Sequence, residues 1–144
     1  MEKIRGVNLG NWLVLEKWMS PELYNDTTAE DETYLCLQLS EGEKRARLKA
    51  HRDHYITSRD FAYLAEKGFN AVRLPVPFFV FEDVGPYVHC SEYVDKAMKW
   101  AKQYGLKVLL DLHTVPGSQN GSDNAGICGI IQWANHPERV EMAL

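Results

Sequence analysis

Residues 91–112 read SEYVDKAMKWAKQYGLKVLLDL, and this stretch decides the fold. Ser91 is a favourable N-cap for a helix, and Gly105 is a favourable residue to end it, because glycine adopts a positive φ without strain. Leu106–Leu112 follows as a mostly apolar strand. Between the cap and the glycine, apolar residues recur with the 3.6-residue period of a helix, at Val94, Ala97, Met98, Ala101 and Tyr104.

The same plan of helix, glycine and strand occurs once before in the chain. Thr57 and Asp60 have the spacing of a capping box, in which an acid at the third helical position bonds back to the cap. Gly68 is expected to end this helix. Phe69–Leu74 then forms a strand that Pro75 stops, because proline has no N–H for the sheet ladder.

A helix followed by a buried strand, repeated, is typical of an α/β protein with a parallel sheet. The two closing glycines lie 37 positions apart, near the roughly 31 residues per unit of a (β/α)8 barrel. Ile4–Leu9 is expected to form the strand before the first helix, and Asn135–Glu138 to begin a third helix. The sequence therefore predicts an α/β fold, the N-terminal part (about three βα units) of a (β/α)8 TIM barrel. Residues 1–144 are expected to form one domain, with no second domain.

A sheet of three parallel strands has two open edges and buries little on the barrel side. We expect Val72 and Leu109 to face the barrel interior without an opposing layer of side chains. A covering partner is therefore expected, either the remainder of a barrel or a second copy of the chain.

The composition is that of an ordinary soluble domain, with 45% hydrophobic and 25% charged residues among 144. Sixteen Lys and Arg against twenty Asp and Glu give a net charge of -4, which disfavours nucleic acid as a partner. Apolar stretches such as Phe78–Phe81 are too short to span a bilayer, so no membrane partner is expected. The first residues lack the apolar segment of a signal peptide.

The cysteines and histidines suggest neither a disulfide scaffold nor a metal site. Cys36, Cys90 and Cys128 are odd in number and form no C-x-x-C motif, which predicts reduced thiols and a cytoplasmic location. His51 and His54 are spaced like a metal pair on a helix, but no further ligand accompanies them, so no metal is expected.

A basic cluster is interleaved with acidic residues on a predicted helix and is expected to be a solvated face. Nucleic-acid binding through this cluster is a weak alternative. The glycine-rich segment Gly117–Gly126 lacks the Gly-Lys-Ser/Thr of a phosphate-binding loop. The basic residues are Lys44, Arg45, Arg47, Lys49 and Arg52.

The loops after the strands are where a barrel builds its site. Each begins with a polar group able to bond a hydroxyl-rich ligand, and aromatic residues lie close by. Polar side chains beside aromatic faces are typical of a sugar site. Trp12 and Trp133 fit a core position as well as a sugar platform. The aromatic residues are Trp12, Trp18, Phe78, Phe79 and Trp133.

Four ordered motifs span most of residues 5–126, and together they resemble glycoside hydrolase family 5, in particular its exo-β-1,3-glucanase and β-glucosidase branch. The resemblance implies a (β/α)8 barrel of retaining β-glycosidases that use no metal or organic cofactor. The motifs are RGVNLGNWLVLE at 5–16, YIT with DF at 55–61, GFNAVRLP at 68–75, and DLH through PGSQNG and DN at 111–124.

The resemblance also implies roles for four side chains. Glu16 and Asn124 are expected to bond sugar hydroxyls, and Arg73 to keep a nucleophilic carboxylate ionised and oriented. His113 is expected to contact the sugar or a carboxylate. Each role has a plainer alternative: Arg73 pairing a structural acid, His113 in a core, and Glu16 in solvent.

Retaining hydrolysis needs two carboxylates about 5 Å apart. The resemblance implies that the acid/base is a Glu directly after an Asn at the end of the fourth strand, and that the nucleophile is a Glu after the seventh. No Asn in this chain is followed by Glu, so both are expected beyond Leu144. Glu16, Asp111 and Asp123 are not expected to form a substitute pair, because Asp111 fits a structural carboxylate bonded to backbone.

The matched stretches depart from the family pattern at three positions. Asn11 stands where a second Gly is usual, and Lys17 where Pro often follows the Glu. Ser122 stands where the exo-glucanase branch commonly has a Phe that clamps the next sugar. Residues 22–54 are expected to form polar helical structure that reshapes the entrance.

The resemblance thus implies a glycosidase for a β-linked glucose-containing oligosaccharide or glucoside. In this interpretation the chain supplies the sugar-binding part of the site without the catalytic pair, and is inactive alone. The alternative is a non-catalytic half-barrel fragment that binds sugar or assembles with a second piece.

Overall fold

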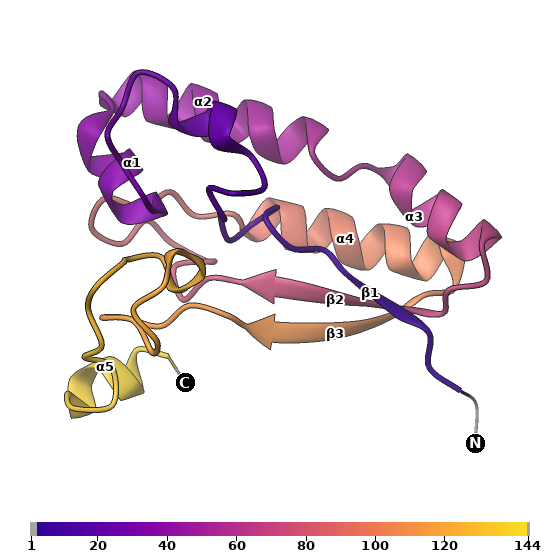
Figure 1. The fold of residues 1–144 in the computed structure, drawn as a ribbon. Coiled ribbons are helices and arrows are strands. Elements are labelled where there is room, and N and C mark those ends of the chain that lie inside the picture. The colour runs from indigo at the N-terminus through magenta and orange to yellow at the C-terminus, as the bar shows by residue number, and fades with distance from the viewer. Residues whose placement is uncertain (1–2, 144) are drawn as a thin grey trace.

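The computed structural model describes residues 3–143, which form three strands, five α-helices and two short 3-10 helices (Figure 1). In chain order the elements are β1 (Gly6–Asn8), η1 (Pro21–Tyr24), α1 (Glu32–Gln38), α2 (Glu41–His54), α3 (Ser58–Glu66), β2 (Ala71–Val76), α4 (Ser91–Tyr104), β3 (Lys107–Leu112), η2 (Asp123–Ala125) and α5 (Pro137–Glu141). None of the helices in this part of the chain is both long and apolar enough to cross a membrane.

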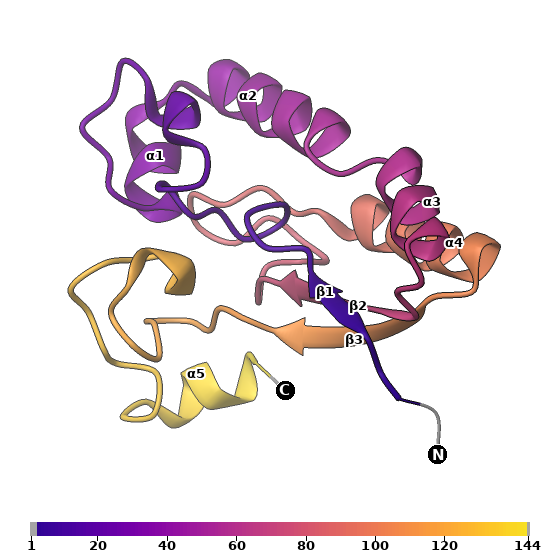
Figure 2. The ribbon, with the colours of Figure 1, turned by 45° about the vertical axis from the view of Figure 1, so that its right-hand side comes forward.

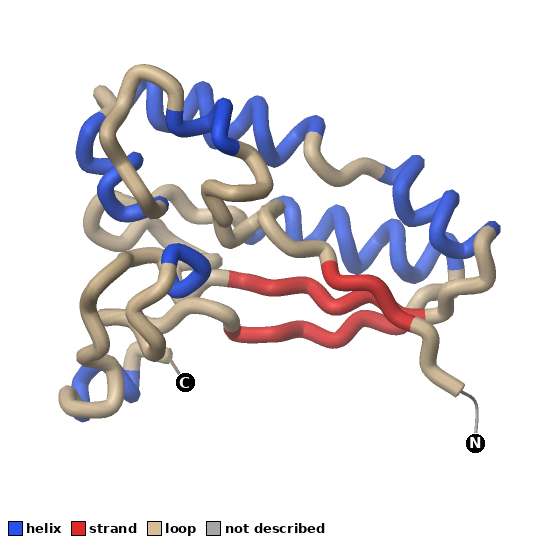
Figure 3. The backbone as a smooth tube through the Cα atoms, in the orientation of Figure 1, coloured by secondary structure: helices blue, strands red, loops and turns tan. Residues whose placement is uncertain are grey.

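The three strands form one parallel sheet in the order β1-β2-β3. The register places Asn8 beside Arg73 and Pro75 beside Asp111. The strands point the same way, so the loops that follow them gather at one end of the sheet, at the left in Figures 1 and 3. This is the arrangement predicted from the repeated helix and strand pattern.

Helices α3 and α4 cover one face of the sheet, and the main hydrophobic core lies between them (Figures 1 and 2). Phe61 of α3 and Ala97 of α4 pack with strand residues Val72 and Leu74. Val72 therefore faces the helices, and its prediction as a barrel-interior residue was wrong. Alternation along a strand makes neighbours point to opposite faces, so the inward residue of β2 is Arg73.

On the face away from α3 and α4 (Figure 2), a largely apolar hollow runs along all three strands. Gly6, Ala71 and Leu109 are among the residues that line this hollow. Leu109 is 62% exposed, as expected of an inward residue without an opposing layer.

The helix ends follow the predicted chemistry closely. The Thr57 backbone N–H and hydroxyl both donate to the Asp60 carboxylate, at 2.7 and 2.8 Å. Gly68 and Gly105 have φ of +81° and +71° and end their helices as expected. Ser91, however, is the first residue of α4 rather than its cap, a position that Cys90 occupies.

The predicted end of the strand before Pro75 was wrong, and so was one residue of the apolar stripe predicted for α4. β2 continues through Pro75. The Leu9 N–H donates to the Arg73 carbonyl, so the backbone of Arg73, and that of Pro75 two residues later, is directed toward β1. β1 ends before it reaches Pro75, so the missing N–H of this proline breaks no ladder bond. Met98 was predicted on the buried stripe of α4, but it is 51% exposed.

Residues 22–54 form a helical layer with a second core of its own (Figure 1). Helical structure was expected here, but the burial was not. The core joins Leu15 and residues of η1, α1 and α2 to Val88 of the loop after β2. Its buried members are Leu15, Leu23, Tyr24, Ala29, Leu35, Cys36, Leu48 and Val88.

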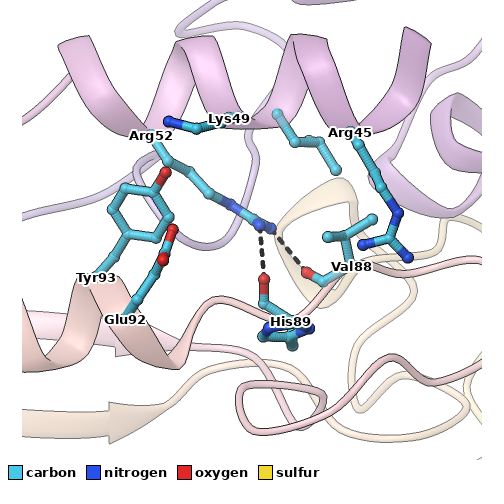
Figure 4. A pocket seen from close by; sticks show the side chains of 8 residues that line it. Arg45, Lys49, Arg52, Val88, His89, Glu92 and Tyr93 are labelled. Atoms are coloured by element: carbon cyan, nitrogen blue, oxygen red, sulfur yellow. Dashed lines mark hydrogen bonds between the residues drawn. The ribbon is translucent and has the colours of Figure 1, made fainter. Parts of the chain in front are cut away.

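The basic cluster of α2 is not simply a solvated face. Arg52 is buried, and its guanidinium donates to the carbonyls of His89 and Val88 (Figure 4). Lys44 is also buried and donates to the Pro86 carbonyl, and Arg47 donates to the carbonyls of Leu23 and Asn25. These cations fasten α2 to neighbouring loops. Arg45 and Lys49 are more exposed and pair with acidic side chains.

Candidate functional site

The inward face of β2 presents Arg73 at the carboxyl end of the sheet. One guanidinium nitrogen, Nη2, lies 2.7 Å from Oδ2 of Asp111, and Nη1 donates to Oδ1 of Asn8 at 3.1 Å. Asn8 and Asp111 belong to the strands on either side. A guanidinium has five N–H donors in a planar fork, so these two acceptors leave donors for a further carboxylate or hydroxyl.

His113, directly after β3, completes this group. Its Nδ1 lies 2.8 Å from Oδ2 of Asp111. Nδ1 also lies 3.3 Å from Nη2 of Arg73, a bond in which Nδ1 would be the acceptor. The contact with Asp111 is shorter, and a carboxylate only accepts, so we assign the proton to Nδ1; a neutral ring in this tautomer has Nε2 as its acceptor. The prediction that Asp111 bonds to backbone was wrong, since the side chains of Arg73 and His113 hold it. The structure thus brings two of the predicted site residues together around one carboxylate.

Glu16 lies at the same end of the sheet, in the loop after β1. A Cβ placed on Gly10 would be 3.2 Å from Glu16 Oε1 and 3.0 Å from Nδ2 of Asn8. The two side chains therefore lie close together, with Gly10 leaving the room that they need. Asn8 also accepts from Arg73, so Glu16 lies on the side of the sheet end where the Arg73 group is found.

Asn11 fixes the backbone that carries Glu16. Its φ is +59°, a left-handed conformation that asparagine tolerates better than most residues. Its side chain accepts from the Glu16 N–H at 2.8 Å and donates to Ser20 Oγ at 2.7 Å. Asn11 therefore adopts a positive φ at the position where the resemblance implies a glycine, and it adds two hydrogen bonds.

Asn124 lies in η2, within the loop after β3. Its Oδ1 accepts from Nδ2 of Asn120 at 3.2 Å. Within the described part of the chain, Asn124 makes no hydrogen bond to Glu16, Arg73 or His113. A hollow is lined by Trp18, which lies two residues after Glu16 in the loop after β1, and by Asp123, which precedes Asn124 in the loop after β3.

Helix α1 supports the loop that carries Asn124, a role that the sequence did not indicate. Thr33 donates both its N–H and its hydroxyl to the carbonyl of Gly126, and its hydroxyl also bonds the Tyr87 hydroxyl. Asp31 accepts from the Cys128 N–H at 2.7 Å. The position of the loop after β3 therefore depends on the helical layer of residues 22–54.

Glu32, also in α1, is a buried carboxyl group with a raised pKa. It is fully buried, and this burial raises its pKa to about 7. Its Oε2 accepts from the Leu15 N–H at 3.3 Å, while Oε1 lies 3.7 Å from Arg52 Nη2. Glu32 thus joins α1 to the loop after β1. Its pair with Arg52 was not predicted, because no packing partner was predicted for either helix.

The remaining sequence candidates have structural roles. His51 donates from Nε2 to the Asn11 carbonyl, and burial lowers the pKa of its ring. His54 bonds the Ala50 carbonyl. Among residues 3–143 no three His, Cys, Asp or Glu side chains are grouped as metal ligands. Trp12 is a core residue, fully buried.

The hollow in Figure 4 is distinct from this site. It is lined by cationic side chains of α2 and by His89, Glu92 and Tyr93. Arg45 and His89 both pair with Asp83, and Lys49 pairs with Asp53. The positive charges are therefore balanced by carboxylates of the protein. Their contacts stabilise the position of α2, and they do not form a binding site for an anion.

Comparisons with known proteins identify the family of the chain. The family profile of Cellulase (glycosyl hydrolase family 5) matches residues 37–136. Glucan 1,3-beta-glucosidase 1 of Schizosaccharomyces pombe is 46% identical over 140 residues, which cover 92% of this chain and 34% of that protein. A probable glucan 1,3-beta-glucosidase A of Aspergillus niger is 47% identical over 135 residues, covering 90% and 32%.

Solved structures show the same fold. The rutinosidase from Aspergillus niger matches with a TM-score of 0.87 and 25% identity, covering 97% of this chain and 41% of that one. The chain spans about a third of the length of the curated relatives it matches. Its three parallel strands and their helices have the arrangement of part of a (β/α)8 barrel. The chain belongs to glycosyl hydrolase family 5.

Proposed function

We propose that the chain forms the first three βα units of a single-domain retaining β-glycosidase and supplies the sugar-binding side of its site. The observation that carries this proposal is the group of Arg73, Asp111, His113 and Asn8 at the carboxyl ends of three adjacent strands, with Glu16 beside it. In barrel enzymes this end of the sheet carries the active site.

In the proposed reaction each side chain has a defined task. The Glu16 carboxylate accepts a hydrogen bond from a sugar hydroxyl, and Asn124 makes a second contact with the same ring. The Arg73 guanidinium stabilises the ionised form of the nucleophile, since a nearby positive charge lowers the pKa of a carboxylate. His113 accepts a hydrogen bond from a sugar hydroxyl at Nε2, while its Nδ1–H donates to Asp111. Such contacts strengthen as positive charge develops on the sugar.

The two catalytic carboxylates come from sequence other than residues 1–144 in this proposal. One protonates the leaving oxygen, and the other attacks the anomeric carbon to form a covalent glycosyl-enzyme, which water then hydrolyses. The reaction uses carboxylates and water and requires no metal or organic cofactor. The remaining strands also cover the apolar hollow along the inner face of the sheet.

A β-1,3-linked glucan or a β-glucoside is the substrate that we propose. The names of the curated relatives support this linkage, because they are glucan 1,3-beta-glucosidases that match nine-tenths of the chain. Cys36, Cys90 and Cys128 are free thiols, which suits a reducing compartment, and we propose the cytoplasm as the location.

The stereochemistry of hydrolysis tests this proposal. A protein that contains residues 1–144 and the remaining barrel is mixed with an aryl β-glucoside, which releases only one sugar, and the anomeric protons of the released glucose are followed by NMR. We expect β-glucose to appear first and the α-anomer to follow by mutarotation. An initial α-product, or no hydrolysis of any β-glucoside, would refute a retaining β-glycosidase.

A further inference from the structure

Trp18 is a large aromatic side chain left open to solvent, with 72% of its surface exposed. Its ring is nevertheless held in place, because the indole Nε1–H donates to Oε2 of Glu16 at 3.1 Å. An exposed ring that is fixed by a site carboxylate offers a flat apolar surface with little loss of conformational freedom when a ligand binds.

The hollow beside Trp18 is bounded by two loops that the fold brings together. The loop after β1 contributes Trp18 and Pro21, and the loop after β3 contributes Ser122 and Asp123. Glu30, from the segment before α1, adds a second carboxylate. Hydroxyl-bonding groups therefore surround one aromatic face, which is the chemistry that binds a sugar ring rather than an apolar ligand.

No other aromatic side chain lines this hollow in the described part of the chain. Ser122, which lines the hollow from the loop after β3, has no aromatic ring. Lys17 also lines the hollow, but its ammonium group is bound to the Ala29 carbonyl and the Glu30 carboxylate, both at 2.8 Å. Trp18 is thus the surface on which a ring can stack, and the hollow has little net positive charge to attract an anion.

The hollow lies next to the sugar contacts already assigned. Trp18 bonds Glu16 directly, and Asp123 precedes Asn124 in the chain. A sugar held by Glu16 and Asn124 would therefore have its neighbouring unit against Trp18. We propose that Trp18 is the stacking platform for this neighbouring sugar and sets a preference for oligosaccharides over glucosides with a small leaving group. This inference rests on the proposed function.

Two substrates that differ only on the leaving side separate this role from others. A β-1,3-linked glucose disaccharide places a sugar on the platform, whereas β-glucosyl fluoride places none there. In a protein that contains residues 1–144 and the remaining barrel, we expect Trp18→Ala to lower the ratio of kcat/KM for the disaccharide to that for the fluoride about tenfold. Trp18→Phe keeps a ring and should retain most of the ratio.

Phe81→Ala is the matched control, because Phe81 is also an exposed ring, at 81%, but does not line the hollow. We expect it to leave the ratio unchanged. A ratio that Trp18→Ala leaves unchanged would overturn the platform, and equal losses for both substrates would show that Trp18 acts only by positioning Glu16.

Failure of the proposed function is distinguishable from failure of this inference. If the wild-type protein hydrolyses neither substrate, the glycosidase proposal is wrong. The disaccharide is then titrated against the indole N–H NMR signal of Trp18. This signal is assigned by its loss in Trp18→Phe. A saturable shift of it supports the platform, and an unmoved signal overturns it.

Discussion

The guanidinium of Arg73 contacts side chains of both neighbouring strands and has further N–H donors for a ligand. It contacts Asp111 at 2.7 Å and Asn8 at 3.1 Å, and it is partly exposed. The pairing of Arg73 with an acid is thus observed, while its role toward a nucleophile stays a prediction. The unused donors of Arg73 leave it able to orient a second carboxylate.

Replacing Arg73 tests its proposed catalytic role. We expect Arg73→Ala to lower kcat by roughly 10²- to 10³-fold, the usual effect of removing one preorganised electrostatic contact. Steady-state kinetics with a β-glucoside measures the change, with Arg45→Ala on α2 as a control outside the site. A near-normal kcat for Arg73→Ala would remove this residue from catalysis.

Asn11 offers a test of the backbone that carries Glu16. Asn11→Ala should lower the free energy of unfolding by about 2–3 kcal/mol, because it keeps the left-handed φ at a cost and leaves the Glu16 N–H without its partner. Asn11→Gly removes only the hydrogen bonds and should cost less. Urea unfolding gives both values, and equal losses would show that the φ of +59° carries no strain.

Glu32 should give the stability an unusual pH dependence. The folded protein keeps the proton of Glu32 up to a pKa of about 7, against 4.5 in the unfolded chain. The folded state thus binds more protons between these values, so this group's contribution to stability falls as the pH rises through that window. Compared with the wild type, Glu32→Gln should therefore gain about 2 kcal/mol between pH 5 and pH 8.

Urea unfolding of both proteins at the two pH values measures this gain. Comparing the two proteins cancels the other titrating groups, including the neighbouring Asp31 and Arg52. A difference that stays constant with pH would mean that Glu32 is ionised in the folded protein at pH 5.

At the scale of elements, the local sequence signals were reliable where a single segment determines the outcome. The capping box at Thr57 and Asp60 and the closing glycines formed as predicted. The errors depended on neighbours that the local pattern does not show. Pro75 fits in β2 because β1 is short, and Arg52 is buried because the loop after β2 presents carbonyl groups to it.

The site shows the same division between motif and packing. The motifs singled out Arg73 and His113, and the structure brings both to Asp111. Asn8, which accepts from Arg73, was missed because this contact follows from strand register. The bonds from Thr33 to Gly126 join residues 93 positions apart, and no local pattern predicts such a contact.

The support that α1 gives to the loop after β3 can be tested at Thr33. Thr33→Val removes its hydroxyl bonds to Gly126 and Tyr87 and should cost about 1–2 kcal/mol of stability. It should also raise KM, because this loop carries Asn124. Tyr87→Phe removes the hydroxyl bond from the other side, so the double variant should lose less than the sum of the two. Additive losses would contradict a shared network.

At the scale of the whole molecule, the helix-covered face is well packed and the inner face of the sheet is open. Leu109 is 62% exposed there, beside an apolar hollow. Side chains of this kind are normally buried in the layers that fill a barrel. We therefore propose that the remaining strands, or a second copy of the chain, cover this face. Two of the site carboxylates already have partners: Asp111 is bound by Arg73 and His113, and Glu16 accepts from Trp18.

Turnover of a β-glucoside by purified residues 1–144 alone tests the central claim most directly. The claim is that this chain supplies sugar contacts and no acid/base and nucleophile pair. We predict no hydrolysis of an aryl β-glucoside by these residues alone, and hydrolysis by the protein that also contains the remaining barrel. Turnover by the chain alone, from a species that sediments as a monomer and is abolished by Glu16→Gln or Asp111→Asn, would contradict the account.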